Sequence, residues 1–116
     1  MQFFFSDGLN DRTNCSNKND MFEWDDQKNK SNVAKHGISL KFAKLNFSGL
    51  VVTAIDSRAD YGETREISIG VAERVAILTV VHTDRKSVCR IISARPALQR
   101  ERQGYEQAIR EASLRS

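Results

Sequence analysis

The segment TREISIGVAERVAILTVVHTDRKSVCRIISAR, residues 64–95, decides the fold. Its first part, TREISIGVA (64–72), alternates apolar and polar residues, which indicates a half-buried β-strand. VAILTVVHT (75–83) is almost continuously apolar and predicts a central strand, and VCRIISAR (88–95) predicts the strand after it. The links between these segments are only a few residues long, so consecutive strands are expected to pair as antiparallel hairpins.

Two short helices are expected upstream of these strands. Asp25 or Asp26 can cap the first helix, and Gly37 suits its end because glycine readily adopts the left-handed conformation of a helix stop. Ser39 can cap a second helix in SLKFAKLNF (39–47), where apolar residues form a partial helical stripe. Both helices are therefore predicted to pack through a narrow apolar face.

The remaining segments complete the expected architecture. FEW (22–24) carries a short alternating strand signal, and LVVTAID (50–56) predicts a fourth strand of the meander. A last helix is expected to start near Pro96, the only proline, and to dock on the sheet through an apolar stripe. The expected fold class is α+β: an antiparallel meander of about four strands, with two short N-terminal helices and a C-terminal helix.

Length and composition fit one small domain. The chain has 116 residues, of which 40% are hydrophobic and 28% charged. Residues 1–20 are polar and aperiodic, so they are predicted to be a disordered extension before a domain at 21–116. No secretory signal or membrane-length apolar run occurs, which indicates a cytoplasmic protein without membrane contact. Cys15 and Cys89 are accordingly expected to be free thiols.

Positive charge gathers at the C-terminal end. The formal net charge is +3, and residues 90–116 alone hold six arginines against three glutamates. This bias fits a polyanionic partner such as RNA or DNA, or an acidic protein. The alternative is a solvated surface in which these charges pair with one another along a helix.

Polar residues stand at the ends of three predicted apolar strand faces. Arg65, His82 and Arg90 each share a face with apolar neighbours, which predicts a cationic patch on the sheet, although strand ends are often polar in any case. Strict alternation along 88–95 places Arg90 and Arg95 on opposite faces. Arginine matches phosphate oxygens and histidine exchanges protons near neutral pH, so this patch suits RNA chemistry.

Glu101 and Tyr105 are four residues apart on one face of the predicted last helix. Glu101 could act as a base beside Arg95 or Arg102, or it could be a surface ion-pair partner while Tyr105 is simply part of the core. No nucleotide-binding or hydrolase motif and no His/Cys cluster is present, so neither a metal site nor a cofactor is expected.

Four segments taken together resemble the BrnT family of toxins from type II toxin–antitoxin systems. They occur in order: FEWDDQKNKSNVAKHGISL (22–40), RADYGETREISIG (58–70), VVHTDR (80–85) and RIISARPALQRERQGYE (90–106). Each segment alone would be a weak signal, but the combination is specific and spans the expected domain.

The resemblance implies a RelE-like fold and a toxin that cleaves RNA without a metal ion and so arrests growth. It also implies a BrnA-type antitoxin, through which the complex would reach operator DNA. By matching position, the catalytic residues would be Arg65, His82, Arg90, Arg95, Glu101 and Tyr105, and the substrate-binding residues would be Lys35, His36, Ser93 and Arg102.

Two alternatives stay open at this point. The chain could be a non-catalytic, toxin-like binding subunit of an autoregulatory repressor complex. The arginines could also be structural, with Arg90 and Arg95 in ion pairs to Glu66, Glu101 or Asp56.

Overall fold

The structure is a computed structural model that describes residues 21–56, 62–73, 76–85 and 88–115. The expected extension at 1–20 lies outside these residues. The elements follow in the order β1 (Phe22–Glu23), α1 (Asp26–His36), α2 (Leu40–Ala43), the 3-10 helix η1 (Lys44–Ser48), β2 (Val51–Ile55), β3 (Glu66–Ala72), β4 (Ala76–Arg85), β5 (Val88–Pro96) and α3 (Gln99–Arg115).

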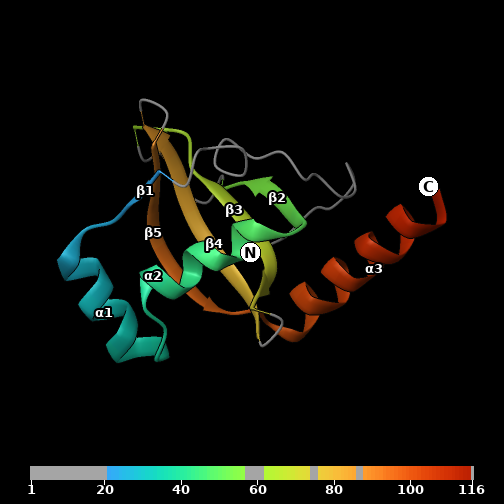
Figure 1. The fold of residues 1–116 in the computed structure, drawn as a ribbon, viewed down its shortest axis with the longest axis horizontal. Coiled ribbons are helices and arrows are strands. Elements are labelled where there is room, and N and C mark those ends of the chain that lie inside the picture. The colour runs from blue at the N-terminus through green and yellow to red at the C-terminus, as the bar shows by residue number, and fades with distance from the viewer. Residues whose placement is uncertain (1–20, 57–61, 74–75, 86–87, 116) are drawn as a thin grey trace.

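The sheet has the strand order β1-β5-β4-β3-β2, and β2 to β5 form the expected antiparallel meander (Figure 1). The expectation of an all-antiparallel sheet of about four strands is wrong in one respect. β1 pairs parallel with β5, with Phe22 opposite Cys89 and Glu23 opposite Arg90, so the sheet is mixed and five-stranded. A two-residue strand whose partner lies far along the chain leaves too little alternation in the sequence to reveal its pairing.

The predicted helix caps are present. The Asp25 side chain accepts a hydrogen bond from the Gln27 backbone nitrogen at 2.8 Å, and Gly37 ends α1 with a φ of 70°. The Ser39 hydroxyl accepts from the Phe42 nitrogen at 3.0 Å. The last helix starts later than expected, at Gln99, because β5 continues through Pro96 before the helix begins.

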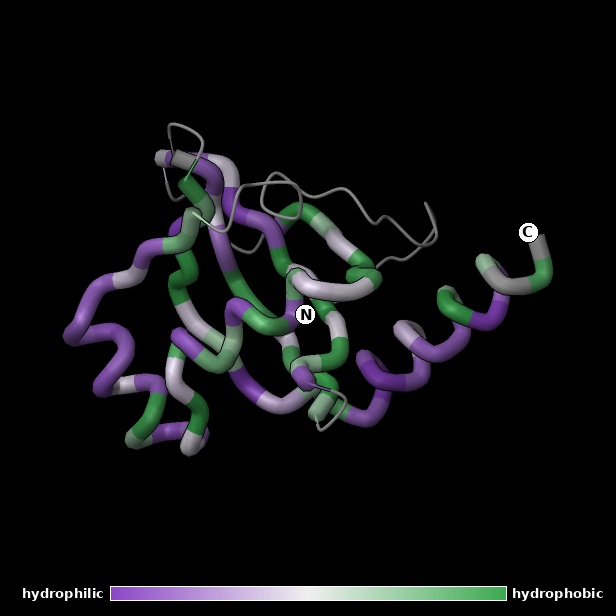
Figure 2. The backbone as a smooth tube through the Cα atoms, in the orientation of Figure 1, coloured by the Kyte–Doolittle hydropathy of each residue, from purple (hydrophilic) through white to green (hydrophobic). Residues whose placement is uncertain are grey.

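Helices cover both faces of the sheet. On one face, Leu40, Ala43 and Phe47 of α2 and η1 pack against buried residues of β4 and β5. On the other, Tyr105 and Ala108 of α3 pack against β2 and β3, while the end of α3 projects beyond the sheet (Figure 1). Figure 2 shows hydrophilic residues along α1 and the start of α3, in contrast to the apolar stretches of the strands. Among the described residues, no helix is long and apolar enough to span a membrane.

A β-bulge in β5 changes which residues share a face. Val81 pairs with Ser93, but its neighbour His82 pairs with Ile91, so Ile92 is an extra residue. Ile91 and Ala94 consequently both lie in the core beneath α2. The expectation that Arg90 and Arg95 lie on opposite faces is therefore wrong, because the bulge brings both onto the face that α3 covers in part.

The expectation of free thiols is also wrong for Cys89. This residue is fully buried in the core beneath α2 and takes part in a disulfide. The other cysteine of the chain, Cys15, lies outside the described residues.

Candidate functional site

The junction between β5 and α3 is held by Glu101. Its side chain is fully buried and accepts two hydrogen bonds from Arg95, Nη1 to Oε1 at 2.7 Å and Nη2 to Oε2 at 2.8 Å. Oε1 also accepts from the Thr79 hydroxyl at 3.0 Å and from the Leu98 backbone nitrogen at 2.8 Å. Burial alone would raise the pKa of Glu101, but the hydrogen bonds and the charge of Arg95 together lower it.

These contacts give Glu101 a clear structural function. It occupies the third position of α3 and satisfies the free nitrogen of Leu98 at the helix start, as in half of a capping box. It also ties β4 and β5 to the helix through Thr79 and Arg95. One of the ion pairs named in the structural alternative, Arg95 with Glu101, is thus present, and it engages the guanidinium of Arg95.

His82 lies in the core, on the face of the sheet opposite to Arg95. Its ring is fully buried, meets the edge of Phe47 with centroids 5.0 Å apart, and has Nε2 2.7 Å from the Ser68 hydroxyl. Nδ1 lies 3.8 Å from a carboxylate oxygen of Glu66. Burial lowers the pKa of His82 to about 3, so the ring is neutral at physiological pH.

The other residues expected at the sheet also have protein partners. Arg90 donates from Nη1 to Oε2 of Glu23 at 2.9 Å, which fastens β1 to β5. Arg65 donates from Nε to Oε2 of Glu63 at 3.2 Å. The Tyr105 hydroxyl donates to the backbone oxygen of Leu50 at 3.0 Å, and burial raises its pKa.

A pocket between α1 and β5 brings together three of the four residues expected to bind substrate. Its volume is about 330 Å³. Lys35 and His36 come from the last turn of α1, and Ser93 comes from β5 beside the bulge. We call it the α1–β5 pocket, and its lining residues are Lys28, Ser31, Asn32, Lys35, His36, Ile92 and Ser93.

The charge of this pocket is uncompensated. No acidic residue lines it, and none of the ion pairs among the described residues involves Lys28, Lys35 or His36. These residues are exposed, in contrast to the paired arginines of the sheet. Two hydroxyl donors, Ser31 and Ser93, complete a lining that suits a phosphate group.

Two asparagines hold α1 in place along the edge of β5. Asn32 is buried, accepts from the Ala94 nitrogen at 3.0 Å and donates to the Ile38 oxygen at 2.8 Å. Asn29 accepts from the Leu40 nitrogen at 2.8 Å. The pocket wall therefore stands on satisfied backbone groups, which fixes the distance between the α1 side chains and the strand.

Sequence reasoning missed Lys28 and Ser31, although a signal was present. Lys28, Ser31 and Lys35 are spaced three, four and seven residues apart, so they share one face of a helix. The fourth expected substrate-binding residue, Arg102, does not line this pocket; it lies on α3 and lines a separate one. No group of side chains in the described part of the chain could hold a metal ion.

A mixed α+β sheet carrying a cationic pocket defines a small protein suited to bind a polyanion. Residues 24–101 match the family model for the ribonuclease toxin BrnT of type II toxin–antitoxin systems. The chain belongs to this BrnT family, and membership implies an RNA substrate and an antitoxin partner.

Comparison with other proteins agrees with this family. The fold resembles the crystal structure of the Brucella abortus ribonuclease toxin BrnT with a TM-score of 0.51 and 25% sequence identity. The match covers 68% of this chain and 99% of that one. No curated protein matches the chain significantly.

Proposed function

We propose that this chain is an endoribonuclease toxin that binds the RNA backbone in the α1–β5 pocket and cleaves it without a metal ion. The observation that carries the proposal is the set of three uncompensated basic side chains in one pocket, Lys28, Lys35 and His36. An anion entering this pocket meets cations that no carboxylate of the described residues already neutralises, so their attraction is available to a phosphate.

The pocket is a better phosphate site than the junction of β5 and α3. The guanidinium of Arg95 is already bound at both ends of the Glu101 carboxylate, and Arg90 is paired with Glu23. An RNA phosphate would have to displace a carboxylate to reach either arginine. We therefore assign positioning roles to Arg90, Arg95 and Glu101, which orient β5 and Ser93 next to the pocket.

The proposed reaction uses the 2′-hydroxyl of the RNA as the nucleophile. The bond from O2′ to phosphorus forms as the bond from phosphorus to O5′ breaks, which leaves a 2′,3′-cyclic phosphate and a free 5′-hydroxyl. The proton of the 2′-hydroxyl is taken up and O5′ receives one. His36 is the exposed imidazole of the pocket and the residue we propose to move a proton, while Lys28 and Lys35 stabilise the phosphorane charge.

The remaining predicted catalytic residues receive other proposed roles. His82 and Tyr105 are buried and hydrogen-bonded, so we propose that they maintain the sheet and its contact with α3. Arg65 lies half-buried beside Glu63 at the start of β3, where it can orient the RNA strand. The likeness to RelE-type toxins expected from the sequence belongs to this proposal as well.

The proposed protein partner is a BrnA-type antitoxin that neutralises the toxin. The same cationic pocket suits an acidic segment of such a partner, which would exclude RNA by occupying its phosphate site. Operator DNA would be reached only through the antitoxin in the complex. Because RNA and operator DNA are the targets, we propose that the protein acts in the cytoplasm.

The test is incubation of the purified chain with end-labelled RNA in EDTA, followed by analysis of the product ends. The proposal predicts cleavage that leaves a 2′,3′-cyclic phosphate or its 3′-phosphate hydrolysis product. RNA with a single 2′-deoxy residue at the cleavage position should stay intact there. Cleavage of the deoxy substrate would rule out the internal nucleophile. An absence of cleavage beside tight antitoxin binding would favour the non-catalytic subunit.

A further inference from the structure

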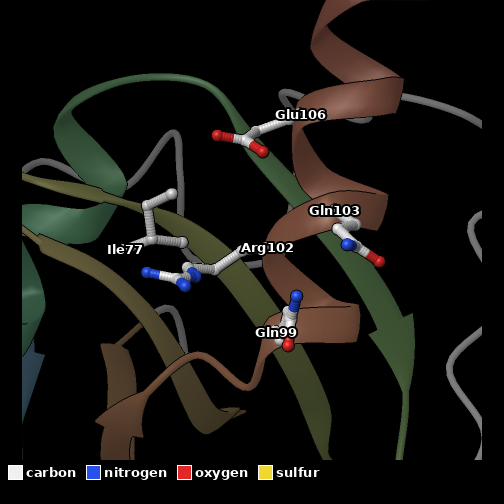
Figure 3. Close-up of a pocket in the computed structure, with 5 residues that line it drawn as sticks. All are labelled: Ile77, Gln99, Arg102, Gln103 and Glu106. Carbon is white, nitrogen blue, oxygen red and sulfur yellow. The ribbon is translucent and has the colours of Figure 1, made fainter.

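A second pocket lies between α3 and the start of β4 (Figure 3). Its volume is about 370 Å³, large enough for a nucleobase with its sugar. Gln99, Arg102, Gln103 and Glu106 line it from α3, and the half-buried side chain of Ile77 lines it from β4. The four helical residues are spaced three, four and seven apart, so a single face of α3 builds the polar wall. We call this the α3–β4 pocket.

The two charged residues of this pocket are not paired with each other. Arg102 and Glu106 have the four-residue spacing at which helical side chains often bond, as Gln107 and Glu111 do at 3.0 Å one turn further on. No ion pair or side-chain hydrogen bond among the described residues engages either one. In Figure 3 the side chains of Arg102 and Glu106 both extend from α3 on the side of Ile77. A donor and an acceptor are thus both available to a ligand above an apolar contact.

We propose that the α3–β4 pocket binds a guanine base of the RNA and so contributes to the choice of cleavage position. The Watson–Crick edge of guanine presents two adjacent donors, N1–H and the N2 amino group, which suit the Glu106 carboxylate. Its O6 and N7 are acceptors that suit the Arg102 guanidinium. Ile77 offers an apolar surface to the face of the ring, and the amides of Gln99 and Gln103 can supply further hydrogen bonds.

Other bases match the pocket less well. Adenine and cytosine present a single amino group beside an acceptor on the same edge, so a carboxylate gains one hydrogen bond and meets a lone pair. Uracil places its one donor between two acceptors. The carboxylate of Glu106 therefore favours guanine over the other three bases.

The position of the pocket is compatible with one RNA strand reaching both sites. Ser93 lines the α1–β5 pocket and Gln99 lines the α3–β4 pocket. Six residues separate them along the chain, and a fully extended segment of that length spans at most about 22 Å. A strand of a few nucleotides can cover this distance. This inference rests on the proposed function, since it assigns a base-binding role beside the proposed phosphate site.

The test compares nucleotide binding and cleavage preference in matched variants. Titration of the full chain with GMP and with AMP should show tighter binding of GMP. Glu106→Gln and Arg102→Gln should each weaken GMP binding about 5- to 150-fold, the range expected for losing one good base contact. Glu111→Gln and Arg110→Gln make the same charge changes on the same helix outside the pocket, and they should leave GMP binding unchanged.

Cleavage of an RNA pool with random sequence separates this inference from the proposed function. The wild-type chain should favour positions near guanine, and Glu106→Gln should lose this preference while still cleaving RNA. Equal binding of GMP and AMP, or an unchanged preference in Glu106→Gln, would overturn the guanine pocket while leaving the ribonuclease intact. Failure of every protein to cut RNA would instead contradict the proposed function, and the GMP titration would still decide the pocket. Binding of an antitoxin peptide but no nucleotide at Arg102 and Glu106 would also overturn it.

Discussion

Arg95 and Glu101 are joined by two parallel hydrogen bonds of 2.7 and 2.8 Å across the turn from β5 to α3. The carboxylate is fully buried, whereas 27% of the arginine side chain is exposed. The pair therefore fastens the helix to the sheet from the inside and leaves only an edge of the guanidinium in contact with solvent. A loss of toxicity on mutation of either residue would consequently report folding as much as catalysis.

Replacement of Arg95 should destabilise the fold. Arg95→Gln leaves the Glu101 carboxylate buried without its cation, a change that costs about 3–5 kcal/mol of unfolding free energy. Chemical denaturation measures this directly. Arg110→Gln removes an exposed arginine from the same helix and should change the unfolding free energy by less than about 0.5 kcal/mol. Equal stability of the two variants would show that the Arg95–Glu101 pair does not hold the junction.

Burial of His82 should make the stability fall in mild acid. The unfolded chain takes up a proton near the ordinary pKa of 6.5, but the folded chain does so only near 3. Stability is therefore full above the ordinary pKa and falls as the pH drops from there toward 3. Between pH 7.5 and 4.5 this one group should cost about 2–3 kcal/mol of unfolding free energy.

Two histidine variants isolate this contribution. His82→Gln should be less stable at pH 7.5 but should lose less stability on acidification than the wild-type chain. His36→Gln changes an exposed histidine and should keep the wild-type pH dependence. An identical slope in wild type and His82→Gln, measured by denaturation across this pH range, would contradict the burial of a neutral imidazole.

Gly70 should be intolerant of a side chain. A Cβ atom at this position would lie 3.0 Å from the Asn46 backbone oxygen and 3.0 Å from Cγ1 of Val51, in the packed layer between β3, β2 and η1. Gly70→Ala should therefore cost about 1–3 kcal/mol of unfolding free energy through overpacking. Gly49→Ala introduces the same methyl group into open space at an extended backbone and should leave thermal melting nearly unchanged. A fully stable Gly70→Ala would show that η1 does not press on β3.

Lys35 should matter for RNA binding without affecting the fold. Lys35→Gln removes one cation from the α1–β5 pocket, so affinity for single-stranded RNA should drop and its salt dependence should weaken by about 0.7 in slope per lost phosphate contact. Lys41→Gln removes an exposed lysine of α2 outside the pocket and should have little effect. Equal salt slopes for both variants, with normal melting curves, would place the RNA elsewhere.

Much of the fold could be predicted because it depends on local patterns. The alternation of Ile67 and Ile69, the caps at Asp25 and Ser39, and the stop at Gly37 are each visible within a few residues of sequence. The parallel pairing of β1 could not be predicted, because it depends on backbone contacts with a strand more than sixty residues away. The bulge at Ile92 leaves no composition signal, yet it decides which face Arg90 and Arg95 share.

The site was harder to predict than the fold because partners decide which charges are available. Sequence reasoning weighted Arg90 and Arg95 above the lysines, but Glu23 and Glu101 engage both arginines. His82 was an attractive base in the sequence, and only the packing of Phe47 and Ser68 around it reveals a buried, neutral ring. Neither fact follows from strand parity.

The most direct test of the central claim is the rate of RNA cleavage in EDTA by the wild-type chain and by His36→Gln, with RNA affinity and melting measured for both. The account predicts that the wild-type chain cleaves without metal. It also predicts that the variant melts normally and binds RNA but cleaves about 100-fold or more slowly, the contribution expected of a proton-transferring side chain. Wild-type cleavage by His36→Gln, or cleavage only after magnesium is added, would contradict the α1–β5 pocket as a metal-independent ribonuclease site.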